Sequence, residues 1–184
     1  KDYSEKYILG KRVDRKLALV IGNSDYKYLS KLKNPVADAK LIAKSLEQIG
    51  FTVIQKYNIT TRSGMFDAID EFELMRGDFD INLIYYSGHG IAVEGENYLI
   101  PTDEDIKTDN PKDPYKMLDR KGFKVESLKK ILEFEKPNQK NIIIFDACRN
   151  NPLKKFKGNK GGLSEVQDPP KGTLIAFSTT YNNV

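Results

Sequence analysis

The chain has 184 residues, of which 39% are hydrophobic and 30% are charged, a composition typical of one globular domain with a well-charged surface. The longest apolar runs, residues 17–21 and 142–145, are far too short to cross a bilayer, so no membrane partner is expected. The net charge of +4 is spread along the chain, with one lysine group in residues 154–160, which favours a solvated surface over nucleic-acid binding.

The first half of the chain alternates strand and helix patterns. Residues 1–15 are polar and show no clear period, so we expect a leader segment before one domain over residues 16–184. Apolar runs predict buried strands at residues 17–21 and 51–54. Helical spacing of apolar residues predicts helices at residues 36–49 and 63–75.

The second half continues the alternation. The expected elements are a strand at 81–86, a hairpin at 91–100, a charged loop at 103–122, a helix at 125–132, a strand at 142–145, a basic loop at 151–171 and a strand at 173–178. Strands that alternate with helices imply parallel crossovers, so the prediction is an α/β fold whose mainly parallel central sheet is covered on both faces.

The cysteine and histidine counts narrow the chemistry. The chain holds one cysteine, Cys148, and one histidine, His89, so it has no internal disulfide, which fits a reducing, cytoplasmic setting. One of each cannot make a nitrogen–sulfur zinc site, which takes three or four such ligands. Any chemistry that they share is therefore that of a nucleophile and a base.

Both residues directly follow predicted strands, at the sheet edge where parallel α/β folds bind ligands. Neighbouring strands lie about 4.8 Å apart, so His89 and Cys148 can come within reach of each other. A thiol needs a neighbouring base or cation to become a good nucleophile. We therefore expect His89 to act as general base for Cys148, with the backbone N–H groups of Gly90 and Cys148 as an oxyanion hole. The alternatives are a buried structural cysteine, a structural histidine and a tight glycine turn.

Several motifs together resemble the caspase and metacaspase clan, most closely bacterial caspase-like and metacaspase domains. They are residues 19–23 (LVIGN), 32–39 (LKNPVADA), 85–90 (YYSGHG), 97–103 (NYLIPTD), 146–152 (DACRNNP) and 174–179 (LIAFST). His89 precedes Cys148 by 59 residues, against about 50 in the caspase signature. The resemblance covers residues 16–181 and implies a three-layer αβα caspase-like fold and a cysteine endopeptidase with protein or peptide substrates.

Caspases have Gln where this chain has Asp146, whereas metacaspase-like enzymes have an acidic residue there that selects basic side chains at P1. By that resemblance, Asp146 and Asp38 would form an acidic S1 pocket for Arg or Lys, as expected of a partly desolvated carboxylate pair. The alternative for Asp38 is a first-turn residue that interacts with the helix dipole. No carboxylate that could orient His89 is evident, so a Cys-His dyad is expected.

The family fold continues beyond the strand at 173–178, so the resemblance implies that the last strand or strands are missing here. We expect a C-terminal small-subunit segment or chain to complete the groove, and self-cleavage after Lys154, Lys155, Lys157 or Lys160, with an uncut enzyme as the alternative. A sensor or regulatory domain that controls the protease, fused or separate, also fits the resemblance.

Many metacaspases need calcium, and the acidic residues that could bind it here are Glu94, Glu96, Asp103, Glu104 and Asp105. They do not form the acidic cluster of those enzymes, so no metal or other cofactor is assigned. Two rival functions are a catalytically silent caspase-like scaffold and a nucleotide-binding domain that uses the turn at residues 22–23. The second lacks both the dinucleotide fingerprint and the P-loop lysine motif.

Overall fold

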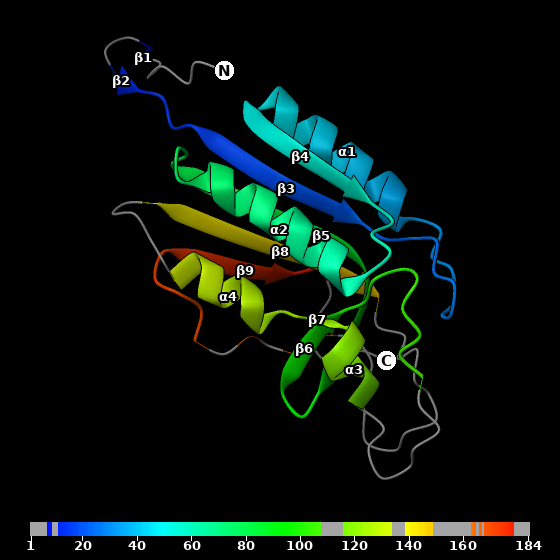
Figure 1. Ribbon diagram of the computed structural model, residues 1–184. Helices are drawn as coiled ribbons and strands as arrows, with labels where there is room; N and C mark the ends of the chain where they lie inside the picture. Colours follow the sequence, from blue (N-terminus) through cyan, green and yellow to red (C-terminus); the bar gives the residue numbers. More distant parts are fainter. Residues whose placement is uncertain are drawn as a thin grey trace.

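A computed structural model describes residues 7–8, 11–107, 116–133, 139–148, 163–164, 166 and 168–178 of the chain. Its centre is a parallel sheet in the order β4-β3-β5-β8-β9 (Figure 1). The strands are β3 (Lys16–Gly22), β4 (Phe51–Tyr57), β5 (Ile81–Val93), β8 (Lys140–Cys148) and β9 (Thr173–Phe177). The mainly parallel sheet predicted from the apolar runs is confirmed.

The helices cover both faces of this sheet, which gives the three-layer αβα arrangement (Figure 1). They are α1 (Pro35–Gln48) on one face and α2 (Arg62–Arg76) and α4 (Glu126–Glu133) on the other, whereas α3 (Lys116–Lys121) lies away from this sheet, next to residues 123–124. Helix α1 starts on Pro35, whose fixed φ suits a first helical position, and the chain turns into β4 at Gly50, which has a φ of 89°. Thr61 caps α2, where its Oγ1 accepts a hydrogen bond from Gly64 N at 3.1 Å.

Alternating side chains of the strands build a separate core on each face, as the two-residue period of a strand requires. On one face, Ala18, Val20 and Tyr85 pack with α1 residues such as Ala39 and Ala43. On the other face, the following residues form the larger core with α2 and α4: Leu17, Leu19, Ile21, Met65, Ile69, Phe72, Ile84, Tyr86, Leu128, Leu132, Ile143 and Phe145. Within the described residues, no helix is long and apolar enough to cross a membrane.

Strand β5 is longer than expected and carries an antiparallel extension of the sheet. Its last residues pair with β6 (Glu96–Leu99), which pairs in turn with β7 (Phe123–Lys124). The hairpin turn lies at Glu94 and Gly95, with φ values of 51° and 87°, as a tight two-residue turn requires. The strand runs through His89 without a break, so the tight-turn alternative for the glycines at 88 and 90 is wrong.

Four short elements were not expected. The leader segment contains β1 (Tyr7–Ile8) and β2 (Lys11–Arg12), which form a separate two-stranded sheet. The stretch expected as a charged loop ends in α3 and leads into β7, where Phe123 is buried with its ring centroid 4.9 Å from that of Phe66. Two-residue strands and a six-residue helix are too short to give a periodic apolar pattern.

Candidate active site

The ends of β5 and β8 bring the predicted nucleophile and base together. In the parallel register of these strands His89 is the partner of Cys148, and Ser87 is the partner of Asp146. The predicted adjacency of the two strands is therefore confirmed at the level of the backbone. The side chain of Cys148 lies outside the part of the chain that the structure describes.

The His89 ring is buried, with only 1% of the residue exposed, and among the described residues it has one hydrogen-bond partner. Its Nε2 lies 2.8 Å from the carbonyl oxygen of Ser30, in the loop between β3 and α1. A carbonyl oxygen can only accept a hydrogen bond, so Nε2 must carry the proton and donate it. In the neutral ring, Nδ1 then holds the free lone pair.

Nδ1 is also buried, and it has no hydrogen-bond partner among the residues that the structure describes. Burial lowers the pKa of His89, and the hydrogen bond to the Ser30 carbonyl opposes this shift. The ring is thus neutral at pH 7 and presents a basic nitrogen that is able to accept a proton.

The main chain of His89 is held by two tyrosines. Its N–H donates to the Tyr26 hydroxyl at 2.8 Å, and its carbonyl accepts from the Tyr86 hydroxyl at 2.9 Å and from Ile100 N at 3.1 Å. The Tyr26 ring also packs against the imidazole, with 4.4 Å between ring centroids. A Cβ on Gly88 would lie 2.7 Å from both tyrosine oxygens, so this position must be glycine for the two hydroxyls to approach.

Asp146 lies beside Tyr85 on the β8 side of the site. Its carboxylate accepts hydrogen bonds from the Tyr85 hydroxyl at 3.0 Å and from the Ser178 hydroxyl at 2.6 Å. Burial raises the pKa of Tyr85, and the negative charges of Asp146 and, more weakly, Asp38 raise it further. Both carboxylates predicted for the S1 pocket therefore act on the same hydroxyl group.

Gly90, predicted as an oxyanion donor, follows His89 on β5, one residue beyond the partner of Cys148. A Cβ at this position would meet Leu163 at 2.7 Å and Ala147 at 3.0 Å. The glycine thus has a packing reason as well as the proposed catalytic one. Leu163, within the basic loop predicted at residues 151–171, packs against the larger core and is partly buried.

Three of the five acidic residues considered for calcium have other partners. Asp103 forms an ion pair with Lys27 at 3.0 Å, and Glu104 forms one with Lys121 at 3.6 Å. Asp105 accepts a hydrogen bond from Lys107 N at 3.1 Å. In the described parts of the chain, no group of three or more His, Cys, Asp or Glu side chains could hold a metal ion.

Asn23, part of the turn considered for nucleotide binding, has a structural role instead. It is fully buried, its Nδ2 donates to the Ile100 carbonyl at 3.3 Å and its Oδ1 accepts from Ile59 N at 3.0 Å. Its amide thus joins the loops that follow β3, β4 and β6. The basic residues Lys154, Lys155, Lys157 and Lys160, predicted as cleavage points, lie outside the described residues.

Sequence reasoning missed the groups that hold His89. It sought a carboxylate as the orienting partner, whereas Nε2 is bound by the main-chain carbonyl of Ser30. A carbonyl is present in every residue, so no residue type marks this role. Tyr26 was missed because its site contact joins two segments 63 residues apart.

Comparison with protein families matches residues 15–184 to the caspase domain. Among curated proteins, the chain is similar to the human mucosa-associated lymphoid tissue lymphoma translocation protein 1 and to its mouse homolog, each 31% identical over 134 residues. That alignment covers 73% of this chain and 15% of either relative, so the chain spans a small part of their length.

Two solved structures share the fold. The Drosophila initiator caspase Dronc matches with a TM-score of 0.61 and 14% identity, over 91% of this chain and 56% of Dronc. The protein GSU0716 from Geobacter sulfurreducens matches with a TM-score of 0.52 and 21% identity, over 77% of this chain and 53% of that protein. With the family match over nearly the whole sequence and the sheet order described above, this chain belongs to the caspase-domain family of cysteine peptidases.

Proposed function

We propose that this domain is a cysteine endopeptidase in which His89 activates Cys148. The observation that carries the proposal is the pairing of these residues on neighbouring parallel strands, next to a buried ring whose Nδ1 has no partner in the described residues. The family supports peptidase chemistry in general. The roles of the two residues are our inference.

The geometry supports a simple sequence of proton transfers. The Ser30 carbonyl keeps the proton on Nε2, so Nδ1 takes the thiol proton of Cys148. The thiolate attacks the substrate carbonyl, and the developing oxyanion is stabilised by the N–H groups of Gly90 and Cys148. Nδ1 then protonates the leaving amine, and water hydrolyses the thioester and releases Cys148.

The test replaces each residue in turn. Cys148→Ala and His89→Ala should each abolish nearly all cleavage of fluorogenic peptides, while circular dichroism and the urea midpoint show an intact fold. A matched control is Cys148→Ser, which keeps the size of the side chain and removes the thiol. Cys148→Ala protein that cleaves at the wild-type rate would end the peptidase proposal, and a folded wild-type protein without any activity would favour the scaffold function.

We also infer a preference for Arg or Lys at P1. The carboxylates of Asp146 and Asp38 lie near the buried Tyr85 on the face of the sheet that carries α1. Tyr85 and Ser178 donate hydrogen bonds to Asp146, which hold its carboxylate in place at the end of β8. A basic side chain can pair with such a carboxylate, whereas an acidic one is repelled.

Processing is proposed in the basic segment that holds Lys154, Lys155, Lys157 and Lys160. The residues that follow it are anchored: Ser164 N donates to Asn97 Oδ1 at 2.8 Å, and Asn97 Nδ2 donates to the Ser164 carbonyl at 2.9 Å. A cut before Leu163 therefore leaves the C-terminal part docked on the domain. Intact mass spectrometry of wild-type and Cys148→Ala protein decides the point, since identical masses in both would mean that no self-cleavage occurs.

A further segment or chain is proposed to complete the sheet. Among the described strands, β9 pairs with β8 alone, and Leu174 on β9 is 61% exposed. An exposed apolar residue on a strand with a free edge favours an added strand or helix there.

A further inference from the structure

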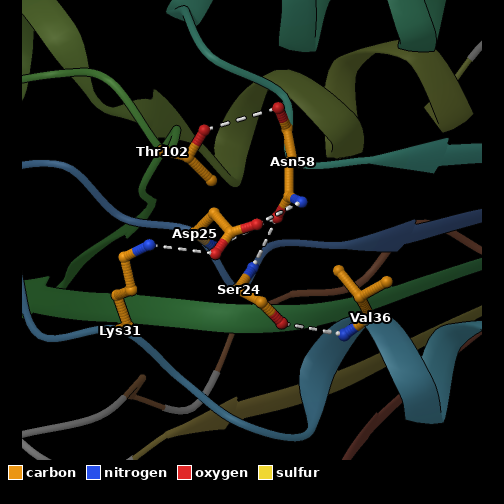
Figure 2. Close-up of polar contacts among 6 residues, drawn as sticks. All are labelled: Ser24, Asp25, Lys31, Val36, Asn58 and Thr102. Atoms are coloured by element: carbon orange, nitrogen blue, oxygen red, sulfur yellow. Dashed lines mark hydrogen bonds and ion pairs between the residues drawn. The ribbon is translucent and has the colours of Figure 1, made fainter.

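The contact between Ser30 and His89 depends on the path of one loop, residues 23–34, between β3 and α1. Ser24 joins the two ends of this loop. Its carbonyl accepts hydrogen bonds from Tyr26 N and Leu32 N, both at 3.0 Å, and its Oγ accepts one from Val36 N at 3.1 Å (Figure 2 shows the last). A shift of Ser24 would therefore move both Tyr26 and the part of the loop that holds Ser30.

Asn58 binds Ser24 from the neighbouring loop, after β4 (Figure 2). Its Oδ1 accepts from Ser24 N at 2.8 Å and from Asp25 N at 3.1 Å, and its Nδ2 donates to the Asp25 carboxylate at 3.2 Å. One side-chain amide thus accepts hydrogen bonds from two consecutive main-chain N–H groups and donates one to a carboxylate. The Asp25 carboxylate also forms an ion pair with Lys31, the residue after Ser30, at 3.3 Å.

The backbone of Asn58 is fixed as firmly as its side chain. Its φ of 51° lies in the left-handed region, which asparagine adopts more readily than most residues. Its N–H donates to the Gly22 carbonyl at 2.9 Å, and its carbonyl accepts from Thr102 Oγ1 at 3.4 Å (Figure 2). Asn58 therefore links the ends of β3 and β4 to the segment after β6, which also bonds to the tyrosines beside His89 through the Ile100 carbonyl.

We propose that Asn58 is a positioning residue for His89, which acts through Ser24 and the loop that carries Tyr26 and Ser30. This role rests on the proposed function of His89, but its structural part can be tested without any substrate. We expect that, without the Asn58 side chain, the Ser30 carbonyl is held less firmly next to Nε2. The proton then lies on Nδ1 in a fraction of the molecules.

The variant that isolates the side chain is Asn58→Gly, because glycine keeps the positive φ and removes only the amide. His89 is the only histidine of the 184 residues, so histidine-selective ¹⁵N labelling gives NMR signals from this ring alone. The wild-type chain should show the neutral tautomer with the proton on Nε2. In Asn58→Gly the two nitrogen shifts should move toward each other as the Nδ1–H tautomer becomes populated.

The kinetic constants of Asn58→Gly should change as well. We expect kcat to fall about ten- to a hundredfold with little change in KM, because a small misplacement of a general base affects the transition state more than binding. The control Asp168→Gly also places glycine at an exposed position of positive φ, 46°, and should leave kcat and the ring shifts unchanged.

A rescue variant separates positioning from a general loss of stability. In Asn58→Asp with Asp25→Asn, the carboxylate still accepts from the N–H groups of Ser24 and residue 25, and the new amide donates to it. This double variant should restore the Nε2–H tautomer and most of kcat, although it loses the exposed ion pair with Lys31, which contributes little. If Asn58→Gly fails to fold, the double variant still allows the ring shifts and kcat to be measured with a changed residue at position 58.

The outcomes are distinct. A mixed tautomer and a low kcat in Asn58→Gly, both restored in the double variant, support the proposal. Wild-type shifts and a wild-type kcat in Asn58→Gly overturn it, as does a wild-type ring that lacks the Nε2–H tautomer. A protein without peptidase activity whose ring shifts still respond to Asn58→Gly would contradict the proposed function and leave the positioning contact intact.

Discussion

His89 and Asp146 follow neighbouring strands of one sheet, but they are held in different ways. His89 is 1% exposed, and its polar contacts are with a main-chain carbonyl, with two buried tyrosine hydroxyls and with the N–H of Ile100. Asp146 is half-buried, and its carboxylate accepts hydrogen bonds from the hydroxyls of Tyr85 and Ser178.

The difference matches what each group must do in the proposed mechanism. A general base needs one tautomer and one orientation, and a buried contact to a carbonyl defines both. A carboxylate that recognises a cation needs to stay charged and accessible, and hydroxyl donors stabilise the charge without neutralising it. Substitutions at the two places should therefore affect different kinetic constants.

The largest effect is expected at Asp146. Asp146→Asn keeps the shape of the side chain and removes its charge, so a P1 Arg loses a charge-assisted pair that contributes about 1.5–3 kcal/mol. We expect kcat/KM for peptides with P1 Arg to fall about ten- to a hundredfold, and the order Arg ≥ Lys, with Asp near background, to flatten. Fluorogenic peptides that differ only at P1 measure this.

The matched control is Asp38→Asn, which removes the more weakly coupled carboxylate and should have a smaller effect in the same direction. A preference for Asp at P1 in the wild-type protein would contradict the pocket assignment and leave the nucleophile untouched.

A smaller effect is expected at Tyr26. Tyr26→Phe removes the acceptor of the buried His89 N–H, and an unsatisfied buried donor costs about 1–3 kcal/mol. Tyr86→Phe is the paired control, because the His89 carbonyl keeps its bond from Ile100 N. The urea midpoint and kcat should both fall more for Tyr26→Phe than for Tyr86→Phe. Equal losses would show that Tyr26 has no special role.

The smallest effect concerns pH. Burial lowers the pKa of His89 below its usual 6.5. As pH falls through 6.5, the histidine of the unfolded chain therefore binds a proton before that of the folded chain does. Stability should decrease below pH 6.5 by no more than about 1.4 kcal/mol per pH unit from this group. His89→Gln lacks the titration, so urea midpoints of the two proteins should converge at acidic pH. Parallel midpoints between pH 7.5 and 5.5 would contradict the lowered pKa.

Sequence patterns predicted the strands and helices whose apolar residues recur at regular spacing along the chain. The apolar runs ending at Ile21, Tyr86 and Phe145 predicted the central strands, and the placement of His89 and Cys148 after neighbouring strands predicted their pairing. The contacts of Ser30 and Asn58 could not be predicted in this way. They depend on main-chain groups and on a left-handed backbone conformation, which only the folded loops bring together.

The most direct test of the His89–Cys148 pair is the pH dependence of alkylation at the only cysteine of the chain. Iodoacetamide alkylates the sulfur as the thiol proton is lost, and a neutral His89 can accept that proton, so the rate should rise as the His89 ring becomes neutral; intact mass confirms a single label. In the wild-type protein the midpoint should lie well below the usual thiol value of about 8.5, and in His89→Ala it should return toward that value. The same midpoint near 8.5 in both proteins would contradict the account.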